Sequence, residues 1–597
     1  MRLDRTRLAL AVTLTALTLL GCGDRDETPT PPAPEPAAKT LQEEMETSSF
    51  RLSTEMRELI WDAEHLALVL SQDFNPIVRG AFRGTKSDRF ASLVSDDFQG
   101  QVFSGEGATR VHGAIAQTRW EATDPRKAID KAGLVAWFRD VGASFKTIEK
   151  IGFHTTTVRP EEPGKLDGRW EGAFDVHVQG ILPDGSRSEL MFLCTLGYKR
   201  LAKDIIGQDG WLDRFETQRA WRVTSRERLL VDVTETSGID TSKLVDNWRS
   251  TEPPFYGVTG GLHAIDANVD GRVDLLINDM NGFFFYEQTE DGRFEDATQR
   301  AGLAFSGGEA VRSVIPGDFN GDGREDLMLL VSRGSAPGEV RLYENREDGT
   351  FARVARGQTG LEGRTFANFD GVVADYDGDG VLDVYVIKAG APAPKSLREA
   401  RWIMDQTSPE GLLLRGEGNW RFRDVTAEAR MTGKSVDTYG AVWFDHEPDG
   451  DPDLFLSNHM GPNVFWRNEG DGTFTSVPLD EGFGGFSMGV SAGDLDDDGD
   501  VDLYIANMYS SAGNRVMGHL RPEHYPEGWF PYIKGFILGN ELYRSDPDGM
   551  KQIGIQSEVD VGGWAYGPAL MDLDGDGRLD IYSPAGFQSV TRGEPDG

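Results

Sequence analysis

The order of apolar and polar residues divides the chain into three parts. A short apolar run from Leu8 to Leu20 follows three arginines near the N-terminus. From about Leu41 to Val231, apolar residues first recur at helical spacing and then in long strand-like runs. Beyond this point, apolar runs of strand length are separated by turns rich in Asp and Gly. We therefore expect an exported chain in which an α+β region precedes a larger all-β region.

In the α+β region, the apolar positions of the first predicted helix are Leu52, Met56, Leu59, Ile60, Ala63, Leu66, Ala67 and Leu70. A second, short helix is predicted around Phe90, Leu93 and Val94, and long strands at Phe145–Val158, Trp170–Leu182, Glu189–Arg200 and Arg219–Val231. The turn Pro183–Ser186 joins two of these strands. Helices followed by a curved antiparallel sheet resemble the NTF2-like cone, a fold that often holds a pocket.

Four polar residues of this region are candidates to line such a pocket, namely His154, Asp175, His177 and Tyr198. Polar residues that alternate along a strand more often lie on its solvated face, and we favour that interpretation. We likewise expect Trp120, Trp137, Trp170 and Trp221 to pack in the core rather than to form a ligand cage.

The all-β region contains six copies of the pattern Asp-x-(Asp/Asn/Glu)-x-Asp-Gly-x-x-Asp. Positions 1, 3, 5 and 9 are Asp266, Asn268, Asp270 and Asp274; Asp318, Asn320, Asp322 and Asp326; Asp375, Asp377, Asp379 and Asp383; Asp445, Glu447, Asp449 and Asp453; Asp494, Asp496, Asp498 and Asp502; Asp572, Asp574, Asp576 and Asp580. Position 6 is Gly in every copy. A single loop of this kind is often only a solvated turn, but six matching copies indicate a shared chemical role.

That role is predicted to be Ca²⁺ binding. Ca²⁺ takes six to eight oxygen ligands, and a tight turn at Gly brings oxygens from positions 1, 3, 5, 7 and 9 together. Mg²⁺ prefers a smaller octahedron and keeps its waters, and transition metals favour His or Cys. An EF-hand would need Glu at position 12, where these loops carry apolar residues such as Ile277 and Leu329. Instead, each loop precedes an apolar run that predicts a buried strand.

Most loops are followed by an apolar strand, an Asp-Gly turn and another strand, as at Leu342-Tyr343, Asp348-Gly349 and Phe351. Each unit therefore holds four strands, with the metal loop between the first and the second. These motifs resemble the FG-GAP/VCBS repeats of integrin α chains and cartilage acidic protein-like proteins over about Val231 to Gln588. The resemblance implies a calcium-stabilised β-propeller that serves as an extracellular binding platform. The fourth loop departs from the pattern, with Glu447 and two prolines.

Successive motifs start 52, 57, 70, 49 and 78 residues apart, which suits propeller blades. Six blades are counted, whereas the family usually closes with seven. The stretch Leu230–Ile239 resembles the outer strand of a blade and is predicted to complete the last one. Alternatively, a further blade follows Gly597.

The long intervals contain two insertions, at about Ala389–Glu410 and Met508–Leu538. Loops on a rigid scaffold commonly carry recognition, so these are candidate ligand surfaces. Their aromatic and His residues are Trp402, His519, His524, Tyr525, Trp529, Phe530 and Tyr532. Packing of the insertions against the propeller is an equally good explanation.

Residues 1–22 read as a signal peptide that ends in Leu19-Leu20-Gly21-Cys22, which resembles a bacterial lipobox with Cys22 as the lipidated residue. Residues 23–41 form a Pro-rich tether, 42–235 the NTF2-like domain and 236–597 the propeller. The expected location is the bacterial envelope, facing the periplasm or the cell surface. Cys194 is the other cysteine, so no intrachain disulfide is expected once Cys22 is lipidated.

The formal net charge of −37 disfavours nucleic acid as a partner. No phosphate-binding Gly loop, nucleophile elbow or His-Glu-x-x-His pattern occurs. The preferred function is a non-enzymatic adhesion or binding module for envelope or extracellular protein or glycan, bound to the membrane through its lipid anchor only. The alternatives are a polysaccharide hydrolase or lyase that uses the propeller, small-molecule catalysis in the cone, and a periplasmic assembly factor.

Overall fold

We describe the protein from a computed structural model. The structure describes residues 60–584 with the exception of residues 62, 65–66, 68–69, 71–73, 163–167, 200–207, 229, 245–260, 280–281, 307, 334–337, 367–369, 388–410, 433–437, 460–461, 478, 480–484, 508–518, 523–529, 531–533, 536, 547–548, 561 and 563–564. The predicted signal peptide, the lipidation residue Cys22 and the tether therefore lie outside the described residues. No described helix is long and apolar enough to cross a bilayer.

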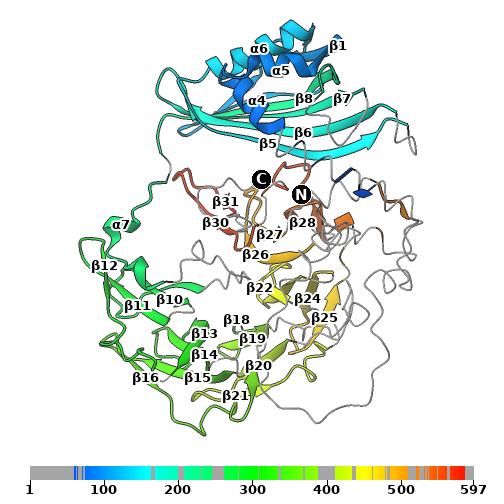
Figure 1. The fold of residues 1–597 in the computed structure, drawn as a ribbon. Coiled ribbons are helices and arrows are strands. Elements are labelled where there is room, and N and C mark those ends of the chain that lie inside the picture. The colour runs from blue at the N-terminus through cyan, green and yellow to red at the C-terminus, as the bar shows by residue number, and fades with distance from the viewer. Residues whose placement is uncertain are drawn as a thin grey trace, which may run out of the picture.

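The first region is an eight-stranded sheet with helices on one face (Figure 1). Its elements are α4 (Asn75–Phe82), α5 (Ser87–Leu93), β1 (Val94–Phe103), β2 (Ala108–His112), β3 (Ile115–Trp120), β4 (Arg126–Ile129), α6 (Lys131–Ala143), β5 (Thr147–Pro160), β6 (Trp170–Ile181), β7 (Arg187–Tyr198) and β8 (Leu212–Ser225). Strands β5 to β8 pair antiparallel in chain order, and β1 joins β8 in parallel.

The burial pattern of β6 shows why this sheet has two different faces. Trp170, Phe174 and Val178 are buried among the helices, whereas the alternate residues are half-buried on the other face. The inward side chains, with those of α4, α5 and α6, form one continuous hydrophobic core. Trp170 is part of that core, and Trp120 and Trp137 pack against it, as predicted. The prediction is wrong for Trp221, which is half-buried and alternates with the buried Ala220 on β8.

The long strands occur where the sequence predicts them, with differences at their ends. Val94 begins β1 instead of ending a helix, and the last strand runs over Leu212–Ser225 rather than Arg219–Val231. Strands β1 to β4 and helix α6 are not predicted from the sequence. Strands β2 and β4 are only five and four residues long, and β2 is exposed along its whole length, so these two lack the periodicity that indicates an element.

The described residues of the second region form five sheets of four or more strands and a two-stranded sheet. The first sheet holds β9 (Gly261–Ile265), β10 (Asp274–Asp279), β11 (Gly282–Gln288) and β12 (Phe294–Asp296), and the second holds β13 (Glu309–Gly317), β14 (Asp326–Arg333), β15 (Gly338–Asn345), β16 (Phe351–Arg353) and β17 (Thr365–Phe366). The third holds β18 (Asp370–Ala374), β19 (Asp383–Ile387), β20 (Leu412–Gly416) and β21 (Phe422–Asp424). The fourth holds β22 (Thr438–Phe444), β23 (Asp453–Asn458), β24 (Val464–Asn468) and β25 (Phe474–Val477). The fifth holds β26 (Ser487–Gly493), β27 (Asp502–Asn507), β28 (Glu541–Asp546) and β29 (Gly549–Gln552), and the last holds β30 (Ala569–Met571) and β31 (Asp580–Tyr582).

The first four strands of each larger sheet pair in chain order, and the acidic loop joins the first to the second. The first strands of consecutive sheets contact one another from β9 through β30, and four hydrophobic clusters lie between the first five sheets. The sheets follow one another around an arc beneath the eight-stranded sheet (Figure 1).

The Asp-Gly hairpins differ from the two-residue turn that the sequence suggests. Gly292 has a positive φ of 78°, but Asp291 is not among the positive-φ residues. The turn closes through two backbone hydrogen bonds, Gly292 N–H to Thr289 O and Thr289 N–H to Arg293 O. Asp291 thus accepts the Thr289 hydroxyl while Gly alone takes the left-handed conformation.

The predicted outer strand at Leu230–Ile239 is wrong as to secondary structure. Its described residues form a turn and the short helix α7 (Thr234–Ser237), followed by the 3₁₀ turn η3 (Thr241–Lys243). Gly238 packs closely on the backbone of Phe294 in β12, and Gly302 and Gly360 pack in the same way on the outer strands of the next sheets. Residues 230–239 therefore correspond to the turn that follows the outer strand in the later repeats.

Candidate functional site

The Asp at the ninth position of each loop forms hydrogen bonds that connect parts of its own repeat. The carboxylate of Asp383 accepts the backbone N–H of Tyr376 in the loop at 3.1 Å and that of Gly416 on β20 at 2.8 Å. The same pair of bonds is made by Asp274, Asp326, Asp453 and Asp502. In the sixth loop, Asp580 accepts from Leu573. One side chain thus ties the loop, the second strand and the third strand together.

Five of the six ninth-position carboxylates are buried, with Asp274, Asp326 and Asp383 fully inaccessible, and Asp580 is half-buried. Burial raises the pKa of Asp326, Asp383 and Asp453 to about 7, although the two backbone hydrogen bonds oppose the shift. The other acidic loop residues raise these pKa values further. A positive charge beside these carboxylates would offset both the loss of hydration on burial and the repulsion from the other acidic residues.

The first position shapes the loop. Asp375 accepts the N–H groups of Asp379 and Gly380 at 3.0 and 2.8 Å, and the corresponding bonds occur in the other five loops. Gly at position 6 has a φ between 81° and 98° in every loop, a conformation that other residues adopt at a cost. The predicted need for Gly at this position is therefore confirmed.

Carboxylates of positions 1, 3 and 9 converge in the third, fifth and sixth loops. Their ligand atoms lie within 4.8 Å of one another in Asp375, Asp377 and Asp383; Asp494, Asp496 and Asp502; and Asp572, Asp574 and Asp580. The first two loops carry Asn268 and Asn320 at position 3. Among the described residues, the fourth loop does not bring Asp445, Glu447 and Asp453 this close.

The fifth position does not join these trios in the structure. Asp270 and Asp322 pair with the nearby guanidinium groups of Arg272 and Arg324. Asp379 is 2.9 Å from Arg415. The side chain at this position therefore already has a cationic partner in these loops.

The donor set fits a hard cation. Every ligand position offers oxygen, and Oδ1 of Asp377 is buried with no hydrogen-bond partner among the described residues. Burial raises the pKa of Asp377, and Arg415 lies on its other oxygen at 2.7 Å. An unpartnered carboxylate oxygen next to two further carboxylates is a suitable ligand for Ca²⁺.

The sixth loop also contacts the first region. His112, at the tip of the β2–β3 hairpin, lies 2.6 Å from Asp576 and 3.7 Å from Asp574. Arg578 is 3.0 Å from the same imidazole. Nearby, Glu558 binds Arg119 of β3 and Arg219 of β8. The two regions are thus joined by polar contacts at this end of the repeats.

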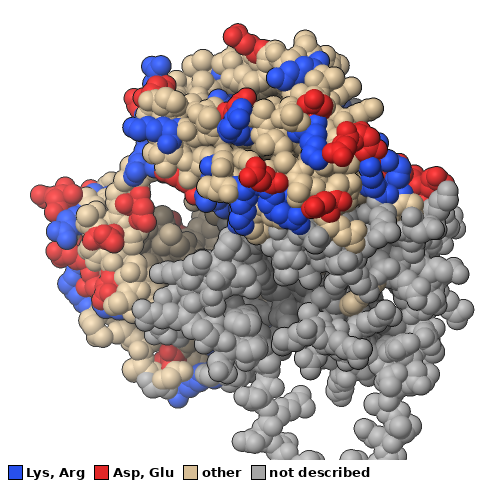
Figure 2. Space-filling model, turned by 45° about the horizontal axis from the view of Figure 1, so that its top comes forward, with Lys and Arg blue, Asp and Glu red and all other residues tan. Residues whose placement is uncertain are grey.

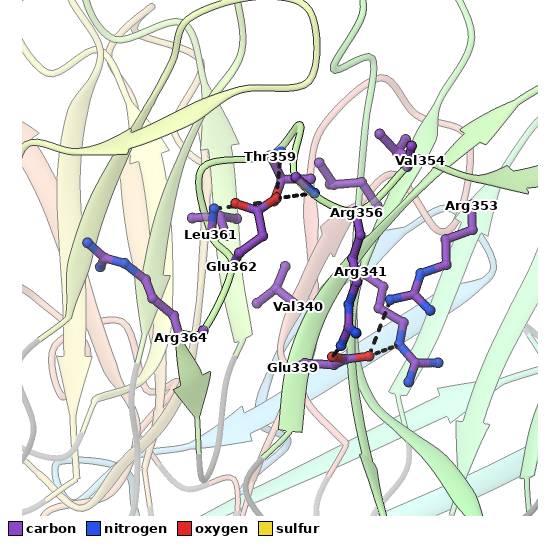
Figure 3. Close-up of a pocket in the computed structure, with 14 residues that line it drawn as sticks. Glu339, Val340, Arg341, Arg353, Val354, Arg356, Thr359, Leu361, Glu362 and Arg364 are labelled. Atoms are coloured by element: carbon purple, nitrogen blue, oxygen red, sulfur yellow. Dashed lines mark hydrogen bonds and ion pairs between the residues drawn. The ribbon is translucent and has the colours of Figure 1, made fainter.

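The sequence does not predict a second feature, an arginine-lined cavity of about 300 Å³ on the second sheet (Figure 3). Arg341, Arg353 and Arg356 surround Glu339, and Glu362 accepts backbone N–H groups at the opposite side. The concentration of arginines within residues 339–364 of so acidic a chain is the signal that could have indicated it. Each of these three arginines already pairs with a carboxylate.

The structure separates the four polar residues proposed for a cone pocket. His154, Asp175 and His177 lie together on the face away from the helices. Tyr198 is fully buried in the core on the other face, beside Trp211. Of the predicted ligand residues in the insertions, Trp402, His524, Tyr525, Trp529 and Tyr532 lie outside the described residues. His519 and Phe530 are described, and burial lowers the pKa of His519.

Acidic and basic side chains alternate on the face drawn in Figure 2, where Lys and Arg lie among Asp and Glu. The described residues on this face form no extended basic surface.

Comparison with known proteins identifies the repeats. The FG-GAP-like repeat family matches residues 266–329, 318–386 and 445–505. Human cartilage acidic protein 1 is 26% identical over 290 residues, which cover 43% of this chain and 41% of that protein. The rat T-cell immunomodulatory protein is 24% identical over 250 residues, 40% of this chain and 36% of that protein. The chain thus spans less than half the length of these relatives.

Among solved structures, an Agrocybe aegerita lectin described as recognising non-reducing terminal N-acetylglucosamine matches with a TM-score of 0.30 and 14% identity, over 70% of this chain and 82% of the lectin. No conclusion rests on a likeness of this degree.

Proposed function

We propose that this protein is an envelope lipoprotein whose FG-GAP-like repeats form a calcium-stabilised β-propeller, used as a non-enzymatic binding module for protein or glycan. The observation that carries the proposal is the repeated loop architecture. In every copy the first-position Asp holds the loop in shape, and in three copies carboxylates of positions 1, 3 and 9 converge. The match to the FG-GAP-like repeat family supports the repeated architecture on which this proposal depends.

The arrangement of the sheets supports the propeller. Consecutive sheets pack face to face, with their first strands side by side, as the blades of a propeller do. The two-stranded last sheet and the turn at Leu230–Ile239 would meet if the ring closes. In the first region, helices over one face of an antiparallel sheet support the NTF2-like cone.

In this proposal, Ca²⁺ would be held by the oxygens of positions 1, 3, 5 and 9, with the fifth-position side chains released from their arginine partners. The bound ion would supply positive charge beside buried carboxylates and so hold neighbouring strands rigidly. The chain itself supplies the turn geometry, through Gly at position 6, and the strand anchoring, through the Asp at position 9. The propeller would then present its loops and surface cavities to a ligand.

The test is binding of the full chain to a panel of envelope proteins and glycans, with Ca²⁺ and with chelator. We expect at least one ligand to be retained only with Ca²⁺, and to be recovered chemically unchanged. The paired change Arg353→Glu and Arg356→Glu probes the arginine-lined cavity. The charge-matched control is the paired change Arg421→Glu and Arg423→Glu, at two exposed and paired arginines elsewhere. Degradation of a glycan, or retention that ignores Ca²⁺, would contradict the proposal.

The membrane anchor is tested separately, because residues 1–59 lie outside the described part of the chain. Metabolic labelling with a radioactive fatty acid should mark the wild-type chain and not the Cys22→Ser variant. Protease added to intact cells then distinguishes surface exposure from a periplasmic location. Labelling that persists in the variant would exclude Cys22 as the lipidated residue.

A further inference from the structure

A group of polar side chains lies on the face of the eight-stranded sheet that is turned away from the helices. His154 on β5 is paired directly with Asp175 on β6, and His177 lies two residues further along β6 on the same face. One nitrogen of each imidazole and one oxygen of Asp175 lie within 4.8 Å of one another. Three ligand-type atoms from two adjacent strands thus face one small volume.

The distances between these atoms suit a shared ion. Nδ1 of His154 is 2.7 Å from Oδ1 of Asp175, and Nε2 of His177 is 3.5 Å from the same oxygen. A tetrahedral ion with bonds of about 2.0 to 2.2 Å holds its ligands about 3.3 to 3.6 Å apart. The His177 separation falls within this range and the His154 separation is shorter, so a small rotation of the His154 ring would admit the ion.

A fourth residue fixes the orientation of His177. Nδ1 of this imidazole lies 3.1 Å from Oε1 of Glu189 on β7, which also accepts Gln179 at 3.1 Å. An ionised carboxylate can only accept a hydrogen bond, so Nδ1 of His177 is the donor in this pair. Nε2, which lies 3.5 Å from Asp175, is then the nitrogen that would bind an ion, and the ion would take the place of any proton on it. A carboxylate that orients the far nitrogen of a ligating imidazole is a common second shell of metal sites.

The donor set differs in kind from that of the acidic loops. Two imidazoles and one carboxylate suit transition-metal ions, whereas the loops offer oxygen alone. We propose that His154, Asp175 and His177 bind a divalent transition-metal ion of the Zn²⁺ class, with at least one coordination position open. Glu189 acts as a positioning residue. This inference is independent of the proposed calcium-dependent binding function.

The site would lie close to the contact between the two regions. Along one cross-strand row, Asp175 is paired with Leu193 and Leu193 with Arg219, so Asp175 and Arg219 share a face. Two strand spacings separate them by about 10 Å. Arg219 binds Glu558 of the repeat region at 2.9 Å. The open position of the ion would therefore face the side of the sheet on which the repeats lie (Figure 1).

The experiment is a Zn²⁺ titration of the full chain in excess Ca²⁺, which keeps the acidic loops occupied. We expect one Zn²⁺ equivalent that is absent in His154→Ala and in His177→Ala, and that remains in the control His263→Ala, a half-buried histidine of the repeat region. Glu189→Gln should keep the site but weaken its affinity 10- to 100-fold. Equal Zn²⁺ binding by wild type and both ligand variants would overturn the proposal.

A spectroscopic measurement on the wild type does not depend on how the variants fold. X-ray absorption at the zinc edge should show two imidazole donors in the shell of the single bound ion. An all-oxygen shell would assign the ion to the acidic loops and overturn the proposal. Failure of wild type to bind Zn²⁺ would do the same and would leave the calcium-dependent function unaffected.

Discussion

The two regions of the molecule are stabilised in different ways. The eight-stranded sheet and its helices share a single core, which runs from Ala63 to Ala220. The repeat sheets have no such common core among the described residues, but four smaller clusters between neighbouring sheets. What every repeat has in addition is a buried or half-buried Asp at the ninth loop position.

This difference suggests that the first region depends on buried apolar area and the second on electrostatic balance. Burying a carboxylate is costly unless hydrogen bonds and a cation compensate for the lost hydration. The backbone supplies the hydrogen bonds at the ninth position. The proposed Ca²⁺ would supply the charge, so its removal should affect the two regions unequally.

The largest expected effect is that of chelation. With a Kd of about 0.1 mM and about 1 mM Ca²⁺, each site would contribute about 1.4 kcal/mol, and six independent sites about 8 kcal/mol. Whole domains are stable by only about 5 to 15 kcal/mol. Chelator should therefore lower the unfolding midpoint of the repeat region by on the order of 10 °C in calorimetry.

The first region is the internal control for this experiment, because its core contains no acidic loop. Chelator should move the unfolding midpoint of the first region by less than about 2 °C in the same calorimetric experiment. An unmoved repeat transition would mean that the loops bind Ca²⁺ too weakly to matter. Equal shifts of both transitions would contradict the comparison between the regions.

The next effect separates two ligand positions of one loop. In Asp383→Asn, one of the two buried carboxylate oxygens becomes an amide NH₂ that faces a backbone N–H. This change should lower the free energy of unfolding by about 2 to 3 kcal/mol. Asp379→Asn changes a carboxylate that is 33% exposed and paired with Arg415, and should cost less than about 1 kcal/mol. Denaturant unfolding in excess Ca²⁺ measures both, and equal losses would refute a special role for position 9.

The contrast between these two positions also shows what the sequence could predict. The repeat spacing indicated the loops, the four-strand order and Gly at position 6, because each leaves a periodic signal. It did not distinguish Asp383 from Asp379, since both are aspartates within one loop. Only the approach of β20, from beyond an insertion, makes Asp383 a buried anchor.

In the first region the same limit appears at His154, Asp175 and His177. Alternation correctly predicted that these side chains are on the face away from the core. It could not predict that they converge, because that depends on the register between β5 and β6. The misassigned Leu230–Ile239 strand has a related cause, since its Asp-x-Thr signature specifies the turn and not the strand before it.

A smaller effect should appear on acidification. Burial lowers the pKa of His459, which directly follows β23, to about 4, so the folded state disfavours the protonated ring. Its contribution to stability is complete above pH 6.5 and is lost as the pH falls toward 4, by up to about 3 kcal/mol. The difference in unfolding free energy between wild type and His459→Gln should therefore shrink over this range. The comparison cancels the loop carboxylates, and a constant difference would contradict the assignment.

The smallest effect concerns the contact that joins the two regions. Glu558 binds Arg119 and Arg219, but these side chains are 27%, 38% and 43% exposed, so solvent weakens the pairing. Glu558→Gln keeps the shape of the side chain and removes its charge. We expect a loss of about 0.5 to 1 kcal/mol, seen as wider separation of the two unfolding transitions in calorimetry at low salt. Wild type in high salt should approach the variant, because screening weakens the same pairs. An effect larger than about 3 kcal/mol would instead mean that the two regions unfold as one unit, and the comparison between them would no longer hold.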